Sequence, residues 1–427
     1  MLIGALSLIV FFALTAFSVE KIFLLLAFYV SGFPMLEYIG NFPGLPFGFA
    51  WYVAYPLFIL LIVYWLIYLL KNQEKFLLNQ MDTAVVVYLA LMFFAAVHGF
   101  FKGYELKILL WDFMPVSFFL GYFIFLYSPL KNKIGKFYTI LLISSLFVSL
   151  QFVNAVAKYR TLVILFRIIS EHIHIVQFAI PFLIATLIYS KSSGKKVLFS
   201  ILLLLNILAV VFCQQRSLYA ATALTVFFMC GVFLYTRRDW IKRNSTRFML
   251  IIASIVTIII VMFIVLQIIT KGKFFLTLYS RLFIFLNLNR LSSDISWKGR
   301  WREIRSALHG LEHFWLFGKG FGVSQITRFR YVRQIVLDQS YIYYIWKTGA
   351  VGLLSFLYMY FIFFKRAIST LKKAITTDER IFIIAALLNT AGMMLIAFAN
   401  VSLGHFRLMF VWAALFACTE IIARKYD

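Results

Sequence analysis

The sequence predicts an all-α, polytopic integral membrane protein with about 12 to 13 transmembrane helices and one large extracytoplasmic loop that contains amphipathic helices. The first observation is composition: mean hydropathy is +0.93 and only 13% of the 427 residues are charged, more apolar surface than a soluble core can bury. The second is that the apolar residues gather in runs near the length of a membrane span. The third is the rhythm of the basic residues. They lie between apolar runs, so the net charge of +25 indicates membrane topology and not a nucleic-acid partner.

The apolar runs are the predicted spans, at 2–17, 21–33, 48–70, 83–102, 106–127, 137–156, 174–190, 197–213, 217–236, 248–270, 341–364, 381–400 and 405–423. The first run has no basic residues before it and no clear cleavage site, so we interpret it as a retained membrane segment. Residues 1–35 hold either two short spans or one long broken element. This choice leaves 12 versus 13 spans, and the side of the N-terminus, open.

Basic clusters occupy every second connection, which is the positive-inside pattern and places them in the cytoplasm. They are Lys71/Lys75, Lys131/Lys133/Lys136, Lys191/Lys195/Lys196, the group from Arg237 to Arg247, the group from Lys365 to Lys373, and Arg424/Lys425. The other connections then face outward, the longest being 271–340. The chain divides into an N-terminal bundle (1–270), this extracytoplasmic loop (271–340) and C-terminal spans (341–427).

The loop 271–340 carries twelve Lys or Arg against four Asp or Glu. Its segment 273–288 is too short, and too interrupted by Arg281, for a span, and a span there would move the basic group at 365–373 outside. A strongly basic outer loop indicates an anionic partner. Attraction to lipid headgroups is an equal alternative.

The middle of the loop predicts an amphipathic helix that lies on the membrane with a basic face upward. Apolar residues recur at helical spacing: Trp301, Ile304, Leu308, Leu311 and Trp315. Basic residues occupy the other side or flank the stripe: Arg300, Arg302, Arg305, His309 and His313. The segment FGKGFG (317–322) then predicts a tight turn with an accessible backbone, because it holds three glycines in five residues.

The short outer turn CQQRSLY (213–219) places Arg216 near membrane depth, beside Gln215. An arginine there is costly unless paired or solvated, so we interpret it as functional, with a snorkelling anchor as the alternative. Asp338 precedes the span 341–364 and is either a site carboxylate or a helix N-cap. His405 and Arg407 lie at the outer end of the last span. Glu171, His172 and His174 form only a weak metal pattern, and no cofactor motif is present, so neither metal nor cofactor is expected.

Together these features resemble the O-antigen ligase/polymerase superfamily of bacterial envelopes: an arginine in a short outer turn (QQRS), a large outer loop running from GRWREI to LFGKGFG, and the segment after it. The ligases show His, then Asn, Ser or Gln, nine residues, and GxxG. Here Asp338–Gln339, nine residues and Gly349–Gly352 keep that spacing. Asp in place of His, and Ala220 where the ligases have Leu, are departures that make the chain more similar to Wzy-type polysaccharide polymerases.

The resemblance implies a metal-independent GT-C-like glycosyltransferase of the bacterial inner membrane, acting at the periplasmic face. The donor would be an undecaprenyl-diphosphate-linked glycan and the acceptor a second glycan, with membrane lipids and a chain-length regulator protein as further partners and no nucleic acid. Arg216 and Arg300 would hold the diphosphate and Asp338 would be the general base. Candidate substrate-binding residues are Arg302, Glu303, Arg305, Gln215, Gln339, His405 and Arg407.

Three alternatives stay open. One is an O-antigen ligase that transfers glycan to the lipid A core of lipopolysaccharide. Another is a transporter or flippase for lipid-linked glycans, which predicts ionisable residues within spans or broken helices. The spans read as poor in charge apart from Asp112, which favours an enzyme. The third, a non-catalytic scaffold, would not gather arginines at one membrane face.

Overall fold

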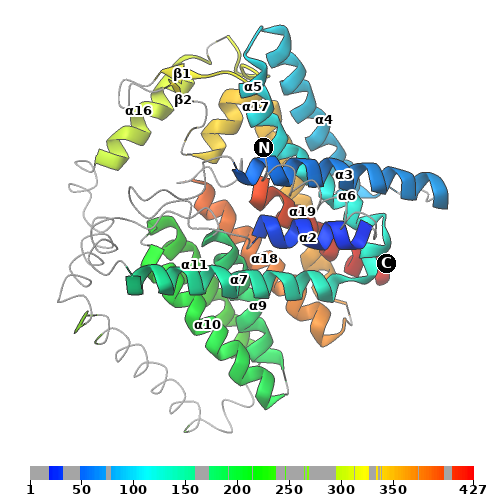
Figure 1. Ribbon diagram of the computed structural model, residues 1–427, viewed down its shortest axis with the longest axis vertical. Coiled ribbons are helices and arrows are strands. Elements are labelled where there is room, and N and C mark those ends of the chain that lie inside the picture. Colours follow the sequence, from blue (N-terminus) through cyan, green and yellow to red (C-terminus); the bar gives the residue numbers. More distant parts are fainter. Residues whose placement is uncertain are drawn as a thin grey trace, which may run out of the picture.

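The protein is an all-α, multi-pass membrane protein, as the sequence predicts (Figure 1). The computed structural model describes residues 19–31, 49–73, 78–158, 173–190, 192–213, 215–236, 246, 264, 267–268, 295–311, 313–326, 333–334, 337, 339–373, 375–398 and 406–427. Within these residues, eight helices are long and apolar enough to cross a membrane. The predicted spans at 2–17 and 248–270 lie outside the described residues, apart from isolated positions in the second, so the total of about 12 to 13 remains a prediction.

Helices account for nearly all of the described chain. In chain order they are α2 (Val19–Ser31), α3 (Phe49–Asn72), α4 (Gln80–Phe101), α5 (Leu106–Ser117), the 3-10 turn η1 (Phe118–Leu120), α6 (Gly121–Leu126), the 3-10 turn η2 (Pro129–Asn132), α7 (Ile134–Lys158), α9 (Ile173–Tyr189), α10 (Ser193–Cys213), α11 (Arg216–Thr236), α16 (Ile295–His309), α17 (Ser340–Leu371), α18 (Thr377–Ala397) and α19 (Phe406–Lys425). Two short strands, β1 (Gln325–Ile326) and β2 (Arg333–Gln334), pair antiparallel within the large loop.

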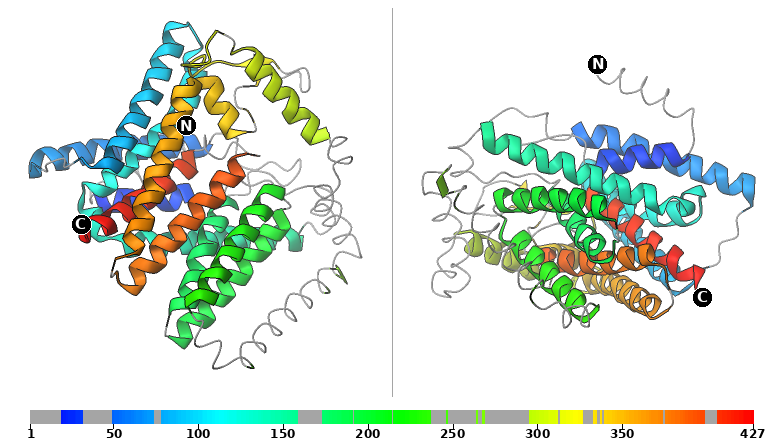
Figure 2. Two further views of the ribbon diagram at one scale, coloured as in Figure 1. Left: turned by 180° about the vertical axis from the view of Figure 1, so that it is seen from behind. Right: turned by 90° about the horizontal axis from the view of Figure 1, so that it is seen from below.

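The helices form two connected groups around α19 (Figures 1 and 2). In one group, α4 packs on α17 and α5, and α6 packs on α19. In the other, α7, α9, α10, α11 and α18 pack on one another. Residues 408–418 of α19 are almost completely buried, because helices surround them. Aromatic contacts fill this centre, such as the stacked rings of Phe363 and Phe416, 4.0 Å between centroids.

Two ends of the bundle matter for function. We define the loop end as the end where α4 finishes at Phe101 and where α5 and α17 begin, and the basic end as the end where α4 begins and α17 finishes. Ion pairs from α19 to α4 and α18 mark the basic end, where Arg424 contacts Asp82 and Lys425 lies 2.9 Å from Glu379. The positive-inside rule predicts that the basic end is cytoplasmic and the loop end extracytoplasmic.

Candidate functional site

Residues 310–323, which we call the docking loop, join α16 to the loop end of the bundle. The amide of Phe321 donates to the carbonyl of Ala95 in α4 at 3.0 Å. Gly320 lies so close to Gly99 that a Cβ on Gly320 would be 2.7 Å from the Gly99 nitrogen. Lys102, just past α4, places its ammonium 4.6 Å from the ring centre of Phe314. The turn predicted at FGKGFG is therefore confirmed, whereas the prediction that its backbone is accessible is wrong, because the glycines of the turn are buried and its backbone bonds to α4 and α17.

The glycines of this turn have backbone conformations that side chains disfavour. Gly318, Gly320 and Gly322 have φ of 68°, 90° and 90°. Glycine takes such angles without steric cost, whereas an L-residue would be strained. A Cβ on Gly318 would also lie 2.5 Å from the carbonyl oxygen of Lys347. The glycine pattern thus serves close approach to other backbones as well as the turn itself.

The docking loop inserts into a kink of α17 at Gly349, where φ is 69° and ψ is −171°. A kink breaks the helical ladder and leaves backbone groups that need partners, above all inside a membrane. The loop supplies these partners in both directions. The amides of Lys319 and Gly320 donate to the carbonyls of Trp346 and Lys347 at 3.0 and 2.9 Å. The amides of Ala350 and Val351 donate to the carbonyls of Trp315 and Leu316 at 2.8 and 3.1 Å.

A buried ion pair lies beneath this junction. The Lys347 ammonium is 2.5 Å from an Asp112 carboxylate oxygen, and their side chains are 0% and 1% exposed. Lys347 also donates to the carbonyl of Val323 at 2.6 Å. Asp112 accepts from the Gly322 amide at 2.7 Å and from the Tyr343 hydroxyl at 3.0 Å. One carboxylate therefore ties together α5, the docking loop and the first half of α17.

Sequence reasoning missed Lys347, and the interpretation that Asp112 is the exceptional charge within the spans is wrong. Lys347 lies inside the predicted span 341–364 and pairs with Asp112. The predicted last span also contains a buried carboxylate, Glu420. A charge inside an apolar run is costly unless it has a partner. A Lys in one predicted span and an Asp in another could therefore have indicated an ion pair between the two spans.

α16 carries most of the predicted basic site residues. Arg302 and Arg305 are exposed, Arg300 is half-buried, and the Arg305 guanidinium lies 5.7 Å from the ring centre of Trp301. Glu303 instead lies on the face toward the protein and is only 5% exposed. The helix packs on α17 and so brings this basic surface to the loop end of the bundle.

The predicted apolar stripe of this helix divides between two environments. Leu311 is buried, whereas Trp301, Leu308 and Trp315 are between 44% and 64% exposed. The buried face of the helix combines Glu303 and Ala307, spaced four residues apart, and the buried Leu311 follows in the docking loop. The exposed tryptophans suit the membrane interface, where aromatic rings gather.

Arg216 and Gln215 lie at the start of α11, as the sequence predicts for the outer turn. The Gln215 carbonyl accepts from the amides of Leu218 and Tyr219, each at 3.1 Å, and Arg216 is half-buried. α11 packs on α9, α18 and α10, whereas α16 packs on α17. The two helices lie apart in Figures 1 and 2. The structure therefore assigns Arg216 and Arg300 to different helix groups and does not bring them into one cluster.

The remaining predicted residues surround α17 and α19. Gln339 is the N-cap of α17 and is 6% exposed. The alternative that Asp338 caps this helix stays a prediction, because that residue is not among those the structure describes. Asp338 and His405 lie outside the described residues, and Arg407 is in the first turn of α19. His174 is buried in α9, whereas Glu171 and His172 lie outside the described residues, so the weak metal pattern stays untested.

Compared with models of known protein families and with the sequences of curated proteins, the chain gives no match. Its function must therefore be argued from its own residues and geometry.

Proposed function

We propose that the protein is a membrane glycosyltransferase that polymerises oligosaccharide units linked to undecaprenyl diphosphate at the extracytoplasmic face of the bacterial inner membrane. The observation that carries the proposal is the docking loop. Through backbone hydrogen bonds, this loop joins the arginine-bearing helix α16 to the kink of α17. The first residue of α17, Ser340, directly follows the Asp338–Gln339 pair in the sequence. One junction thus joins a basic surface to the helix that the candidate base precedes in sequence.

The chemistry assigns a role to each part. The acceptor hydroxyl attacks the anomeric carbon of the donor sugar, its proton passes to the Asp338 carboxylate, and the bond to the diphosphate breaks. Negative charge grows on the leaving diphosphate, which arginine can bind through two parallel hydrogen bonds. We assign this task to Arg216 and Arg300, with Arg302 and Arg305 on the same helix as Arg300. The exposed tryptophans near α16 suit a substrate whose lipid tail stays in the bilayer.

The deciding experiment is reconstitution. Purified protein in liposomes should convert a synthetic undecaprenyl-diphosphate oligosaccharide into a ladder of longer chains on the same lipid. Transfer to lipid A core, with no ladder, would instead establish the ligase. Absence of both products from correctly folded protein would contradict the proposal that the protein is a glycosyltransferase.

One observation favours a second candidate, a transporter for lipid-linked glycans. A broken helix and an intramembrane ion pair are features of transporters. Here, however, the docking loop satisfies the broken backbone, and the ion pair is completely buried and lines no open path among the described residues. A flipping assay in the same liposomes separates the two: a transporter moves the donor across the bilayer without lengthening it.

A further inference from the structure

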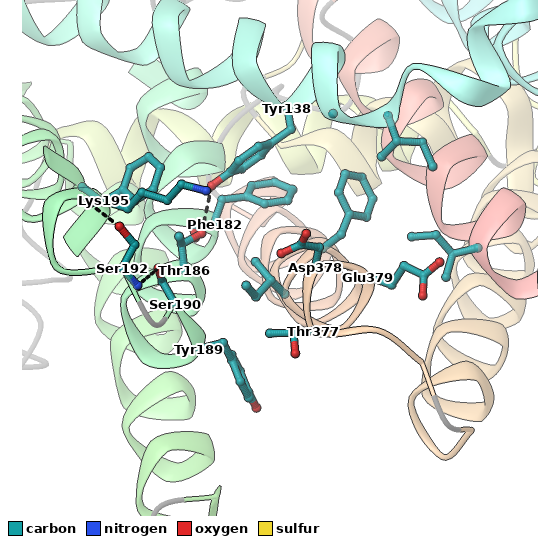
Figure 3. Close-up of a pocket in the computed structure, with 16 residues that line it drawn as sticks. Tyr138, Phe182, Thr186, Tyr189, Ser190, Ser192, Lys195, Thr377, Asp378 and Glu379 are labelled. Atoms are coloured by element: carbon teal, nitrogen blue, oxygen red, sulfur yellow. Dashed lines mark hydrogen bonds between the residues drawn. The ribbon is translucent and has the colours of Figure 1, made fainter.

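A cavity lined by described residues lies at the opposite end of the bundle from the candidate site. It is a pocket of about 730 Å³ between α7, α9, α10 and α18 (Figure 3). Each helix lines it with one face, for example Lys195 and Phe199 of α10, four residues apart. It opens where α7, α10 and α18 begin, which is the basic end of the bundle.

The pocket is polar at its rim and aromatic inside. Lys195 and Asp378 lie in the first turns of α10 and α18 and approach the space from different sides (Figure 3). Phe182, Phe199 and Phe382 line it further along their helices. This gradient fits an amphiphile with a charged head and an apolar tail, and the volume falls in the usual range of small-ligand pockets.

Some polar side chains of the pocket already have hydrogen-bond or ion-pair partners within the protein. Tyr138 and Thr186 bond each other at 2.9 Å and so fasten α7 to α9. Glu379 is held by Lys425 at 2.9 Å and by the Tyr426 hydroxyl at 2.7 Å. Among the described residues that line the pocket, the charges left to meet a ligand are therefore one ammonium, on Lys195, and one carboxylate, on Asp378.

Exposed apolar side chains beside this pocket indicate that it lies next to the bilayer. On α10, Val197, Leu198 and Ile201 are 62%, 62% and 54% exposed, as expected for residues that face lipid. Phe199, between them, lines the pocket. An amphiphile from the adjacent leaflet could therefore place its head at the rim while its acyl chains remain along α10.

We propose that this pocket is a binding site for an aminophospholipid of the cytoplasmic leaflet, such as phosphatidylethanolamine. Lys195 binds the phosphate, with the Ser192 hydroxyl as a second donor, and Asp378 accepts hydrogen bonds from the primary ammonium. A lipid with only a negative head would meet Lys195 but be repelled by Asp378. The zwitterion satisfies both charges. This proposal stands on the pocket alone and is independent of the glycosyltransferase assignment.

The test is lipid binding to the delipidated full chain, measured by native mass spectrometry with lipids of identical acyl chains. We expect phosphatidylethanolamine to bind about tenfold more tightly than phosphatidylglycerol, since a hydrogen bond to a charged group is worth about this factor. Asp378→Asn should remove most of that preference, whereas Lys195→Gln should weaken the binding of both lipids, because both carry the phosphate that Lys195 binds. Lys196→Gln, the same change one residue along on α10, is the matched control and should preserve both the preference and the binding.

A charge exchange gives a second, stricter test. Asp378→Lys should abolish the preference, and the double exchange with Lys195→Asp should restore it, because the head can reverse its orientation in the pocket. Equal binding of the two lipids by the wild type would overturn the proposal. So would a preference that survives Asp378→Lys, or phosphatidylcholine binding as tightly as phosphatidylethanolamine, since choline has no N–H hydrogen to donate to Asp378.

Discussion

The loop end and the basic end of the bundle both bury charged side chains, but the partners of these buried charges differ. At the basic end, the buried carboxylates Asp82 and Glu420 meet Arg424, and Glu420 also accepts from Arg366 at 3.0 and 3.1 Å. The side chains of these arginines remain about a quarter exposed, at 24% and 27%. At the loop end, Lys347 and Asp112 are both completely buried, and the backbone of the docking loop completes their bonding.

The basic end uses a network of partly exposed ion pairs to hold helices together, whereas the loop end uses a buried ion pair beneath an exposed basic surface. The basic end ties α4, α17 and α19 together through several exchangeable bonds whose cations still reach water. Among the described residues, the loop end has one completely buried ion pair, Lys347–Asp112, and its exposed arginines, Arg302 and Arg305, lie on α16. Charges that hold helices together are thus mostly paired internally, whereas those proposed to bind a substrate are held at the surface.

The prediction with the largest expected effect concerns which side of the membrane each end of the bundle faces. A cysteine at Ser292 should react with an impermeant thiol reagent in intact cells, and a cysteine at Asn244 should not. Both belong in a background that lacks the three native cysteines, because Cys230 is exposed. Cell lysis, as the control, should make Asn244→Cys reactive. The opposite pattern in intact cells would remove the lipid-linked substrate from the proposed site.

The next largest effect tests the support at the loop end. Lys347→Met leaves Asp112 charged in a dry site, which should cost about 3–5 kcal/mol of stability. Adding Asp112→Asn removes the orphan charge but keeps an acceptor for Gly322, so the double variant should recover much of the loss. Thermal unfolding of the purified protein measures both.

Arg366→Met is the matched change at the basic end. We expect it to cost about 1–2 kcal/mol, because Glu420 retains its bonds from Arg424 and Asn79. Equal losses at the two ends would contradict the comparison between a single dry pair and a network.

The predicted base gives an effect on turnover. Asp338→Asn keeps the size of the side chain but cannot take a proton, so glycan transfer should fall by roughly 10²-fold or more. Expression and thermal unfolding should be unchanged. Activity close to wild type would exclude Asp338 as the base.

The two arginines give a smaller effect that asks whether they act together. Arg216→Lys and Arg300→Lys keep the charge but lose the paired hydrogen bonds to phosphate, so each should lower transfer by about tenfold or more. If both bind one diphosphate, the double variant should lose less than the product of the single losses. Because α11 and α16 pack in different groups, multiplicative losses would leave two separate phosphate contacts. Arg380→Lys at the basic end is the control, and EDTA should leave wild-type activity intact.

How much could be predicted from the sequence depends on whether a feature is local. Apolar runs gave the helices closely: 137–156 became Ile134–Lys158, because polar helix ends continue the same ladder. α17 extends to Leu371, well past the predicted 364, since Lys365 and Arg366 are good helix formers that reach out of the bilayer. The glycine turn was also predictable from its own residues.

The partners of these local features were not predictable. The residues FGKGFG predict a turn. They do not predict that the amides of this turn donate hydrogen bonds to carbonyls beside the kink at Gly349. Likewise the stripe of α16 indicated an amphipathic helix, whereas its buried face includes Glu303. Backbone pairing across some thirty residues of sequence, and the choice of which face meets protein or lipid, depend on tertiary packing.

The smallest predicted effect belongs to Asp427 at the basic end. Hydrogen bonds and attraction from Arg366 and then Lys373 lower the pKa of its carboxyl to about 2. A lowered pKa in the folded state adds stability above the ordinary value near 3.8 and loses it as the pH falls toward 2. Since the side chain is 43% exposed, solvent screening limits this contribution to less than about 1 kcal/mol. Asp427→Asn should therefore shift thermal unfolding only slightly, and by a constant amount between pH 6 and pH 8. A shift that changes across this range would mean that another titrating group shares the network with Arg366.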